Sequence, residues 1–189
     1  MIILIGGASH AGKTLISQKL IEKYHYPCTS LDHLKMGFIR SGRTELTVKD
    51  DYKMRFWLWP FAAEMLKTAI ENNQNMILEG CYIPKEWKQS FTPEYQKDIR
   101  AVFIGMSESY LRNHFESLSK YANVIENRID DELNLERLIA CNKEFKEDCL
   151  ENGTPFIEIE DEYNLDEILK EISAIIQCQE TEMVMRVNE

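Results

Sequence analysis

A complete phosphate-binding motif near the amino terminus restricts the fold of this 189-residue chain more than any other feature. Residues Gly7 to Thr14 read GASHAGKT and match the pattern G-x-x-x-x-G-K-[ST] without a mismatch. The apolar run at residues 1–5 precedes the motif and indicates a short buried strand. Apolar residues spaced as one face of a helix follow it. The motif therefore lies between a strand and a helix, which is the context that it requires.

This loop predicts a site for the phosphates of a nucleoside triphosphate. Glycines let backbone N–H groups turn toward phosphate oxygens, and the following helix adds unpaired N–H groups and the positive end of its dipole. We expect Lys13 to contact the β- and γ-phosphates and the Thr14 hydroxyl to bind Mg²⁺. A glycine-rich turn without chemical function is the less favoured alternative. The predicted nucleotide-binding residues are Gly7, Ala8, Ser9, His10, Ala11, Gly12, Lys13 and Thr14.

Composition and charge limit the partners that the chain can have. Hydrophobic residues make up 44% and charged residues 29%, which is typical of a soluble globular domain. The formal net charge of −10 disfavours nucleic acid as a partner. No apolar stretch approaches a membrane span, so we expect no membrane partner. The five scattered cysteines lack metal-ligand spacing, which favours reduced thiols and a cytoplasmic location.

Strand-like and helix-like segments alternate along the chain, which predicts an α/β domain with a five-stranded, mainly parallel sheet flanked by helices. A long helix is expected from about residue 48 to residue 71, with a kink or a break near Trp59 because Pro60 lacks a backbone N–H. The strands are expected at residues 1–5, 26–31, 76–79, 100–105 and 155–159.

The chain has no repeat and no low-complexity linker, which indicates a single domain over residues 1–177. Residues 118–132 are polar and lack clean periodicity, and we interpret them as a candidate lid. Residues 178–189 are predicted to form a C-terminal tail that extends the last helix or frays. Ser107 and Asn164 are expected to cap the helices that follow the last two strands. The sequence indicates no oligomeric state.

Acidic residues follow two of the predicted strands, at the edge where parallel sheets bind ligands. Asp32 follows the second strand and is the candidate general base that takes a proton from an acceptor hydroxyl, with helix capping as the alternative. Glu79 ends the third strand and is a candidate ligand of Mg²⁺ or substrate, with a solvated carboxylate as the alternative. Gly80 would let a substrate approach the backbone closely.

Several arginines could supply positive charge to transferring phosphates or to an anionic acceptor. Arg40 and Arg43 lie in a segment just beyond Asp32 and are either a clamp for a phosphate or carboxylate, or ordinary surface charges. Arg112 and Arg128 flank the candidate lid. We assign Arg128 to transition-state stabilisation, with a surface ion pair to its acidic neighbours as the alternative.

Three segments together resemble the nucleoside/nucleotide-kinase branch of P-loop proteins, which includes adenylate, shikimate, gluconate and uridine kinases and the zeta-toxin proteins. The segments are GGASHAGKT, SLDHL after the second strand and ILEG at the end of the third. More narrowly, LDHLKMG and LEGCYIP resemble bacterial proteins labelled as 2-phosphoglycerate-kinase-like or as adenylate kinases. The resemblance covers nearly the whole chain, although only the P-loop is strongly specific.

This resemblance implies a three-layer P-loop NTPase fold, Mg²⁺-ATP as donor, and an acceptor site after the second and third strands. Position by position, it implies that Asp32 is the acceptor-side carboxylate, Gly80 the acceptor-side glycine and Arg112 a lid-hinge arginine near the nucleotide. The sequence Glu79-Gly80 replaces the Asp-Gly-x-Pro-Arg pattern of adenylate kinases. The arginine that grips a nucleoside monophosphate is absent there, which argues against a true adenylate kinase.

The sequence therefore predicts an ATP-dependent kinase that transfers the γ-phosphoryl group of Mg²⁺-ATP to a hydroxyl or phosphate of a small-molecule acceptor. A nucleotide-binding switch or regulatory ATPase is one alternative, and a toxin-like kinase of a nucleotide sugar is another. No Asn-Lys-x-Asp motif follows a strand, which argues against a GTPase.

Overall fold

The computed structural model describes residues 1–121 and 133–187. Within these ranges the strands form one five-stranded sheet in the order β2-β3-β1-β4-β5, and every neighbouring pair is parallel. The predicted α/β class and five-stranded sheet are confirmed. The strands are β1 (Ile2–Gly7), β2 (Cys28–Ser30), β3 (Met76–Glu79), β4 (Ile99–Met106) and β5 (Phe156–Ile159).

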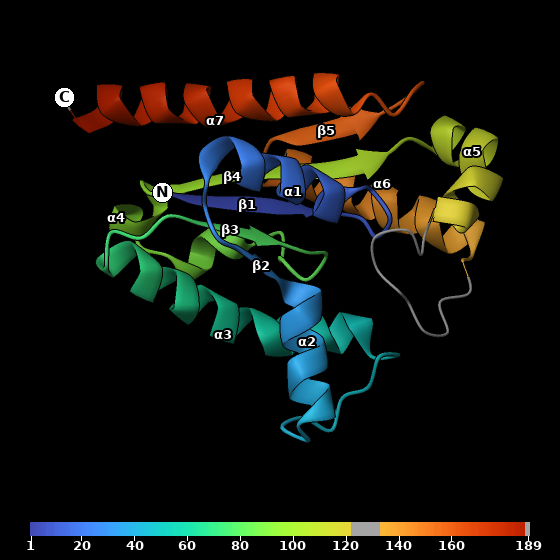
Figure 1. The fold of residues 1–189 in the computed structure, drawn as a ribbon, viewed down its shortest axis with the longest axis horizontal. Coiled ribbons are helices and arrows are strands. Elements are labelled where there is room, and N and C mark those ends of the chain that lie inside the picture. The colour runs from blue at the N-terminus through green and yellow to red at the C-terminus, as the bar shows by residue number, and fades with distance from the viewer. Residues whose placement is uncertain (122–132, 188–189) are drawn as a thin grey trace.

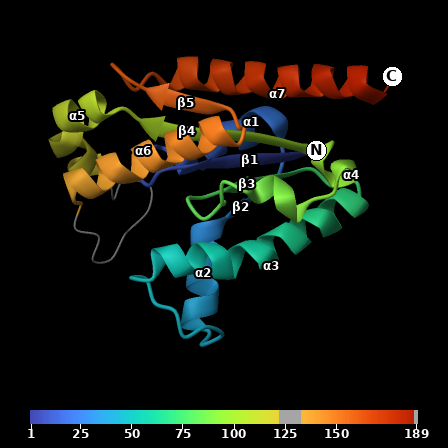
Figure 2. The same ribbon diagram turned by 180° about the vertical axis from the view of Figure 1, so that it is seen from behind.

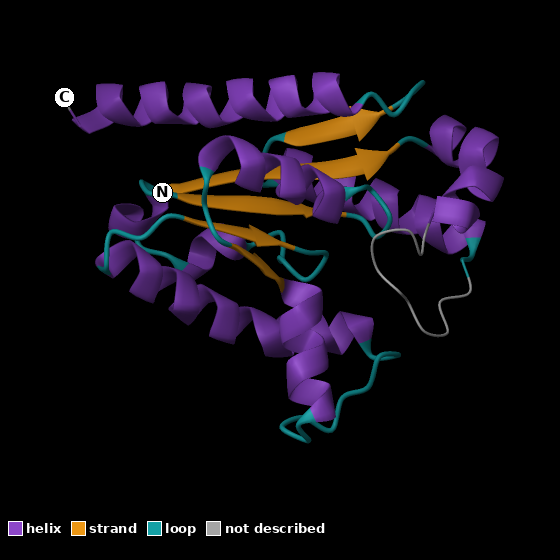
Figure 3. Cartoon of the chain, viewed as in Figure 1, coloured by secondary structure: helices purple, strands orange, loops and turns teal. Residues whose placement is uncertain are grey.

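Helices cover both faces of this sheet and give the fold three layers (Figure 3). The helices are α1 (Lys13–Tyr24), α2 (Leu31–Arg40), α3 (Asp51–Glu71), α4 (Pro93–Gln96), α5 (Glu108–Tyr121), α6 (Leu135–Glu151) and α7 (Leu165–Val187), with a 3₁₀ turn η1 (Trp87–Ser90) before α4. Helices α1 and α7 lie on one face of the sheet, and α3 and α6 lie on the other (Figures 1 and 2).

The central strand β1 supplies both halves of the core. Ile2 and Leu4 pack in the cluster that includes α3 and α6, whereas Ile3 and Ile5 pack in the cluster that includes α1 and α7. Successive side chains of a strand point to opposite faces, so a sheet covered on both sides requires apolar residues at every position. This explains why the strand is a continuous apolar run in the sequence.

The helix boundaries follow local sequence signals. Ser107 Oγ accepts a hydrogen bond from the Tyr110 N–H at 3.1 Å, and Asn164 Oδ1 accepts one from the Glu167 N–H at 3.3 Å. Both predicted caps are confirmed. The backbone of α7 is helical as far as Val187, so it continues through most of the predicted tail.

Helix α3 runs without interruption through Pro60, so a break near Trp59 is wrong, whereas the alternative of a kink stays a prediction. Proline removes the hydrogen bond to the carbonyl four residues earlier, which belongs to Phe56. Both Pro60 and Phe56 are exposed, so water can reach that side of the helix. The opposite side of α3 buries Leu58 and Ala62 in the core, and this packing holds the helix together across the missing bond.

No helix in the described ranges is long and apolar enough to cross a membrane. The cysteines are free thiols: Cys28, Cys81, Cys141, Cys149 and Cys178.

The buried side-chain amide of Asn142 on α6 holds the end of β4 by a hydrogen bond. Asn142 Oδ1 accepts a hydrogen bond from the Met106 N–H at 2.6 Å, and its Nδ2 donates to the Leu138 carbonyl at 2.8 Å. We expect Asn142→Ala to lower the free energy of unfolding by about 2 kcal/mol, because it leaves a buried N–H without an acceptor. Urea denaturation measures this change.

The matched control is Asn72→Ala, since Asn72 Nδ2 also donates to a helix carbonyl, that of Thr68, but on an exposed surface. We expect this variant to stay within roughly 0.5 kcal/mol of the parent. Equal losses in the two variants would contradict a special role for Asn142.

Candidate functional site

The P-loop connects the central strand β1 to α1 at the carboxyl edge of the sheet (Figure 1). Its backbone makes sharp bends: φ is +117° at Gly7, +66° at His10 and +79° at Gly12. A Cβ atom on Gly7 would lie 2.0 Å from the Ile104 carbonyl oxygen, so only glycine fits there. The residue before the first turn of α1 is Gly12, so its own side chain cannot cap the N–H groups of that turn.

Lys13 lies folded over this loop. Its side chain is buried, and Nζ donates a hydrogen bond to the Ala8 carbonyl at 2.6 Å. Thr14 follows it in the first turn of α1. The residues predicted to bind phosphate thus form one continuous loop and helix start. An incoming phosphate would have to replace the Ala8 carbonyl as the partner of the ammonium group.

A chain of polar contacts crosses the neighbouring strand ends. Asp32 lies in the first turn of α2, and its Oδ1 is 3.1 Å from Lys35 Nζ. Lys35 Nζ donates to the Tyr82 hydroxyl at 2.6 Å, and that hydroxyl donates to Asp51 Oδ1 at 2.8 Å. Arg137 Nη2 is 3.6 Å from Asp51 Oδ2. Burial, together with nearby acidic groups, raises the pKa of Tyr82, so the phenol keeps its proton.

Cys81 lies between Gly80 and Tyr82, directly after β3, and is half-buried. Burial raises the pKa of Cys81 to about 11, and Asp32 also raises it, while Lys13 and Lys35 lower it. The charges of Lys13 and of Asp32 thus act on this thiol in opposite directions. The P-loop follows β1 and Asp32 follows β2, so both lie at the carboxyl edge of the sheet, with β3 between the two strands.

Arg55 on α3, which the sequence analysis did not select, packs against α6. Burial raises the pKa of Cys141 on α6, whereas the charge of Arg55 and a hydrogen bond with the Ser9 backbone lower it. The Arg55 guanidinium lies 4.9 Å from the centre of the Phe145 ring. Within the described residues Arg55 forms no salt bridge. The only sequence signal for Arg55 is its place one turn after Asp51 on α3.

Glu79 and Gly80 end β3 between the two neighbouring strands. Glu79 pairs in register with Ser30 of β2 and with Ile5 of β1, and its side chain is only 2% exposed. The alternative of a solvated strand-end carboxylate is therefore wrong. Gly80 has a φ of +151°, and a Cβ atom there would lie 2.8 Å from Leu31 Cβ. The glycine lets the start of α2 pack against the sheet.

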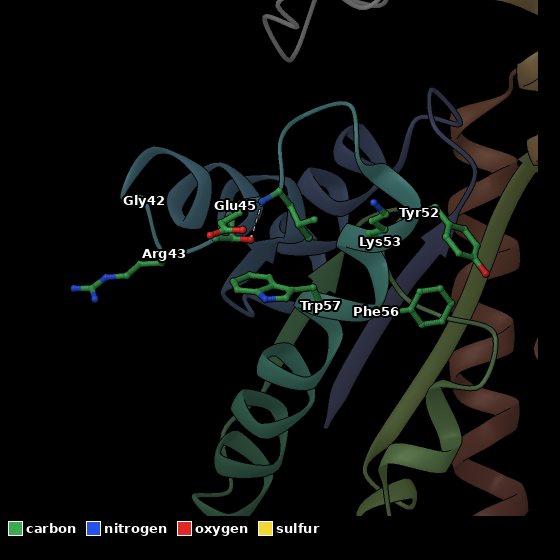
Figure 4. A pocket seen from close by; sticks show the side chains of 9 residues that line it. Gly42, Arg43, Glu45, Tyr52, Lys53, Phe56 and Trp57 are labelled. Carbon is green, nitrogen blue, oxygen red and sulfur yellow. Dashed lines mark hydrogen bonds between the residues drawn. The ribbon is translucent and has the colours of Figure 1, made fainter.

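The structure does not bring Arg40 and Arg43 to this site. Both side chains are exposed, and Arg40 ends α2 about 12 Å along the helix axis from Asp32. Helix α2 points away from the sheet (Figure 1). Arg43 instead borders a surface groove of about 860 Å³ together with Phe56 and Trp57, and its guanidinium points away from these rings (Figure 4).

Arg112 on α5 is held by two carboxylates. Its guanidinium is 2.8 Å from Glu108 Oε1 and 2.9 Å from Glu136 Oε1. Nucleotide binding by Arg112 stays a prediction, and it would require release from these partners. Arg128 and nearly all of the candidate lid at 118–132 lie outside the described residues.

Similar proteins were found by comparison of structure and not by comparison of sequence. No protein-family model matches the chain, and no curated protein matches it in sequence. Shikimate kinase from Acinetobacter baumannii in complex with shikimate has a TM-score of 0.60 at 16% identity, over 94% of this chain and 93% of that one. Gluconokinase from Sinorhizobium meliloti 1021 has a TM-score of 0.58 at 17% identity, over 97% and 95%.

A deoxyadenosine kinase from M. mycoides is similar as well, with a TM-score of 0.57 at 16% identity over 94% of this chain and 100% of that chain. At these identities the similarity establishes the fold. The chain has the three-layer fold of P-loop kinases, as the sequence predicted. The narrower resemblance to 2-phosphoglycerate-kinase-like proteins stays a prediction.

Proposed function

We propose that this chain is a kinase that transfers the γ-phosphoryl group of Mg²⁺-ATP to a hydroxyl group of a small, negatively charged acceptor. The observation that carries this proposal is that the P-loop with Lys13, after β1, and the first turn of α2 with Asp32, after β2, both lie at the carboxyl edge of the parallel sheet. A phosphate cradle next to a carboxylate is the arrangement that in-line phosphoryl transfer requires. The names of the fold's structural neighbours, kinases of small molecules, support it.

Each side of the site has a defined role in this reaction. Loop N–H groups and Lys13 stabilise the β- and γ-phosphates. Asp32 accepts the proton of the acceptor hydroxyl while that oxygen bonds to the γ-phosphorus, and the bond to the bridging oxygen breaks to release ADP. Lys35, 3.1 Å from Asp32, orients the carboxylate.

Two side chains of the chain suit a magnesium ion that accompanies the nucleotide. The Thr14 hydroxyl and the Glu79 carboxylate are hard oxygen ligands, and each lies at the end of an element that borders the P-loop strand. No three metal-ligating side chains cluster in the described part of the chain. Magnesium in kinases needs only one or two protein ligands, because phosphates and water supply the others. The ion neutralises phosphate charge when bound.

The charges around Asp32 favour an anionic acceptor. Arg55 is a cation without an ion-pair partner in the described structure, and Arg137 reaches the same network through Asp51. Guanidinium groups bind carboxylates and phosphates with paired hydrogen bonds. Shikimate and gluconate, for which two structural neighbours are named, are both hydroxy acids. We therefore infer a hydroxy acid or a sugar phosphate as the acceptor.

An acceptor panel tests the proposed function directly. With Mg²⁺-ATP, we expect ADP formation to rise when a hydroxy acid or sugar phosphate is present, and to stay low with nucleosides, nucleoside monophosphates or nucleotide sugars. A coupled ADP assay measures it. Lys13→Ala is the control and should lose ATP affinity at least roughly tenfold, because the triphosphate loses its main cation. ADP formation that no acceptor stimulates would refute the kinase.

Asp32→Asn tests the general base. The amide keeps the shape of the side chain but cannot accept the proton, so we expect kcat to fall by roughly 100-fold or more. ATP affinity should change little, because Asp32 faces the acceptor. Steady-state kinetics and calorimetric ATP titration separate the two effects. An unchanged kcat would remove Asp32 from the mechanism.

Arg55→Met tests the acceptor-binding cation and leaves most of the side-chain stem in place. We expect the acceptor KM to rise roughly tenfold or more with the KM for ATP nearly unchanged, because a charge-assisted hydrogen bond is lost. Arg43→Met is the matched control, since Arg43 is exposed beside the groove of Figure 4. If Arg43→Met raised the acceptor KM and Arg55→Met did not, the clamp expected from the sequence would be the correct one.

A further inference from the structure

Tyr82 joins two helices of the candidate site through its hydroxyl group. It lies in the connection after β3, and its side chain is only 3% exposed. Lys35 Nζ on α2 donates a hydrogen bond to the Tyr82 hydroxyl at 2.6 Å, and the hydroxyl donates to Asp51 Oδ1 on α3 at 2.8 Å. The hydroxyl therefore takes part in two charge-assisted hydrogen bonds, as acceptor in one and as donor in the other.

The chemistry of the three groups sets the direction of these hydrogen bonds. A lysine ammonium group only donates, and an ionised carboxylate only accepts. Burial raises the pKa of Tyr82, so the phenol keeps the one proton that it gives to Asp51. Its oxygen then presents a lone pair to Lys35. The Tyr82 hydroxyl is thus a neutral acceptor at a defined position beside the ammonium group.

This acceptor matters because Lys35 also contacts the proposed general base. Lys35 Nζ is 3.1 Å from Asp32 Oδ1, and the two residues are one turn apart on α2. An ion pair of this spacing is weak by itself, because a long lysine side chain loses conformational freedom when it is held. Tyr82 gives the ammonium group a second partner on a different segment of the chain. With both partners, the Lys35 side chain is held against Asp32 and is only 11% exposed.

We propose that Tyr82 is a positioning residue of the phosphoryl-transfer reaction. Its hydroxyl holds the Lys35 ammonium group at the Asp32 carboxylate, and this keeps the carboxylate in the orientation in which it takes the proton of the acceptor hydroxyl. A negatively charged acceptor attracts the same ammonium group, so a second anchor is needed to keep Lys35 at Asp32 while the acceptor is bound. The inference rests on the proposed function, because Asp32 needs this orientation as a general base.

Tyr82→Phe tests this role, because it removes the hydroxyl and keeps the ring. With the acceptor that most stimulates ADP formation, we expect kcat to fall roughly tenfold and the KM for ATP to change less than about threefold, because only the base loses its orientation. Lys35→Met should lower kcat at least as much. In the double variant, kcat should equal that of Lys35→Met, because the hydroxyl has no further effect once the ammonium group is absent. Steady-state kinetics below the melting temperature of each variant measure these effects.

Tyr95→Phe is the matched control, because the Tyr95 hydroxyl also donates to a carboxylate, that of Glu71 at the far end of α3. Glu71 is about 30 Å along the helix from Asp51. Loss of this hydroxyl should therefore leave kcat equal to that of the parent.

An unchanged kcat in Tyr82→Phe would overturn the proposal and leave the hydroxyl as a purely structural link between α2 and α3, seen as a lower melting temperature alone. Losses of kcat that multiply in the double variant would also overturn it, because Tyr82 would then act without Lys35. So would a parent-like kcat of Lys35→Met, even if Tyr82→Phe did not fold. These results leave the kinase reaction in place, whereas a parent protein that forms no ADP with any acceptor would refute the proposed function as well.

Discussion

The close packing of the P-loop backbone against β4 and Tyr163 is the constraint on which the rest of the structure depends. A Cβ atom at Gly6 would lie 2.5 Å from the Phe103 ring, one at Gly7 would lie 2.0 Å from the Ile104 carbonyl oxygen, and one at Gly12 would meet Tyr163. The glycines that expose loop N–H groups to phosphate are thus also those that let the loop seat against the sheet. Because glycine has no side chain, the same residues allow the loop to pack closely against the sheet and expose its N–H groups.

Local signals in the sequence were sufficient for most of the fold. β3 begins at Met76 and ends at Glu79 as predicted, because an apolar run bounded by a glycine defines a buried strand. The capping residues Ser107 and Asn164 act through neighbours three residues away, so they too could be predicted. Of the kink or break expected near Trp59, the break was wrong, because tertiary packing of α3 outweighs the loss of one solvent-exposed hydrogen bond.

The acceptor side of the site could be predicted only in part, because it is built from contacts between distant segments. Asp32 was found from its place after a strand, but its contact with the network through Lys35 depends on Tyr82, 47 positions after Lys35 in the chain. Arg55 is one charged residue on a long helix, and only the fold brings it against α6. Arg40 and Arg43 follow Asp32 closely in sequence, yet α2 carries them away from the sheet.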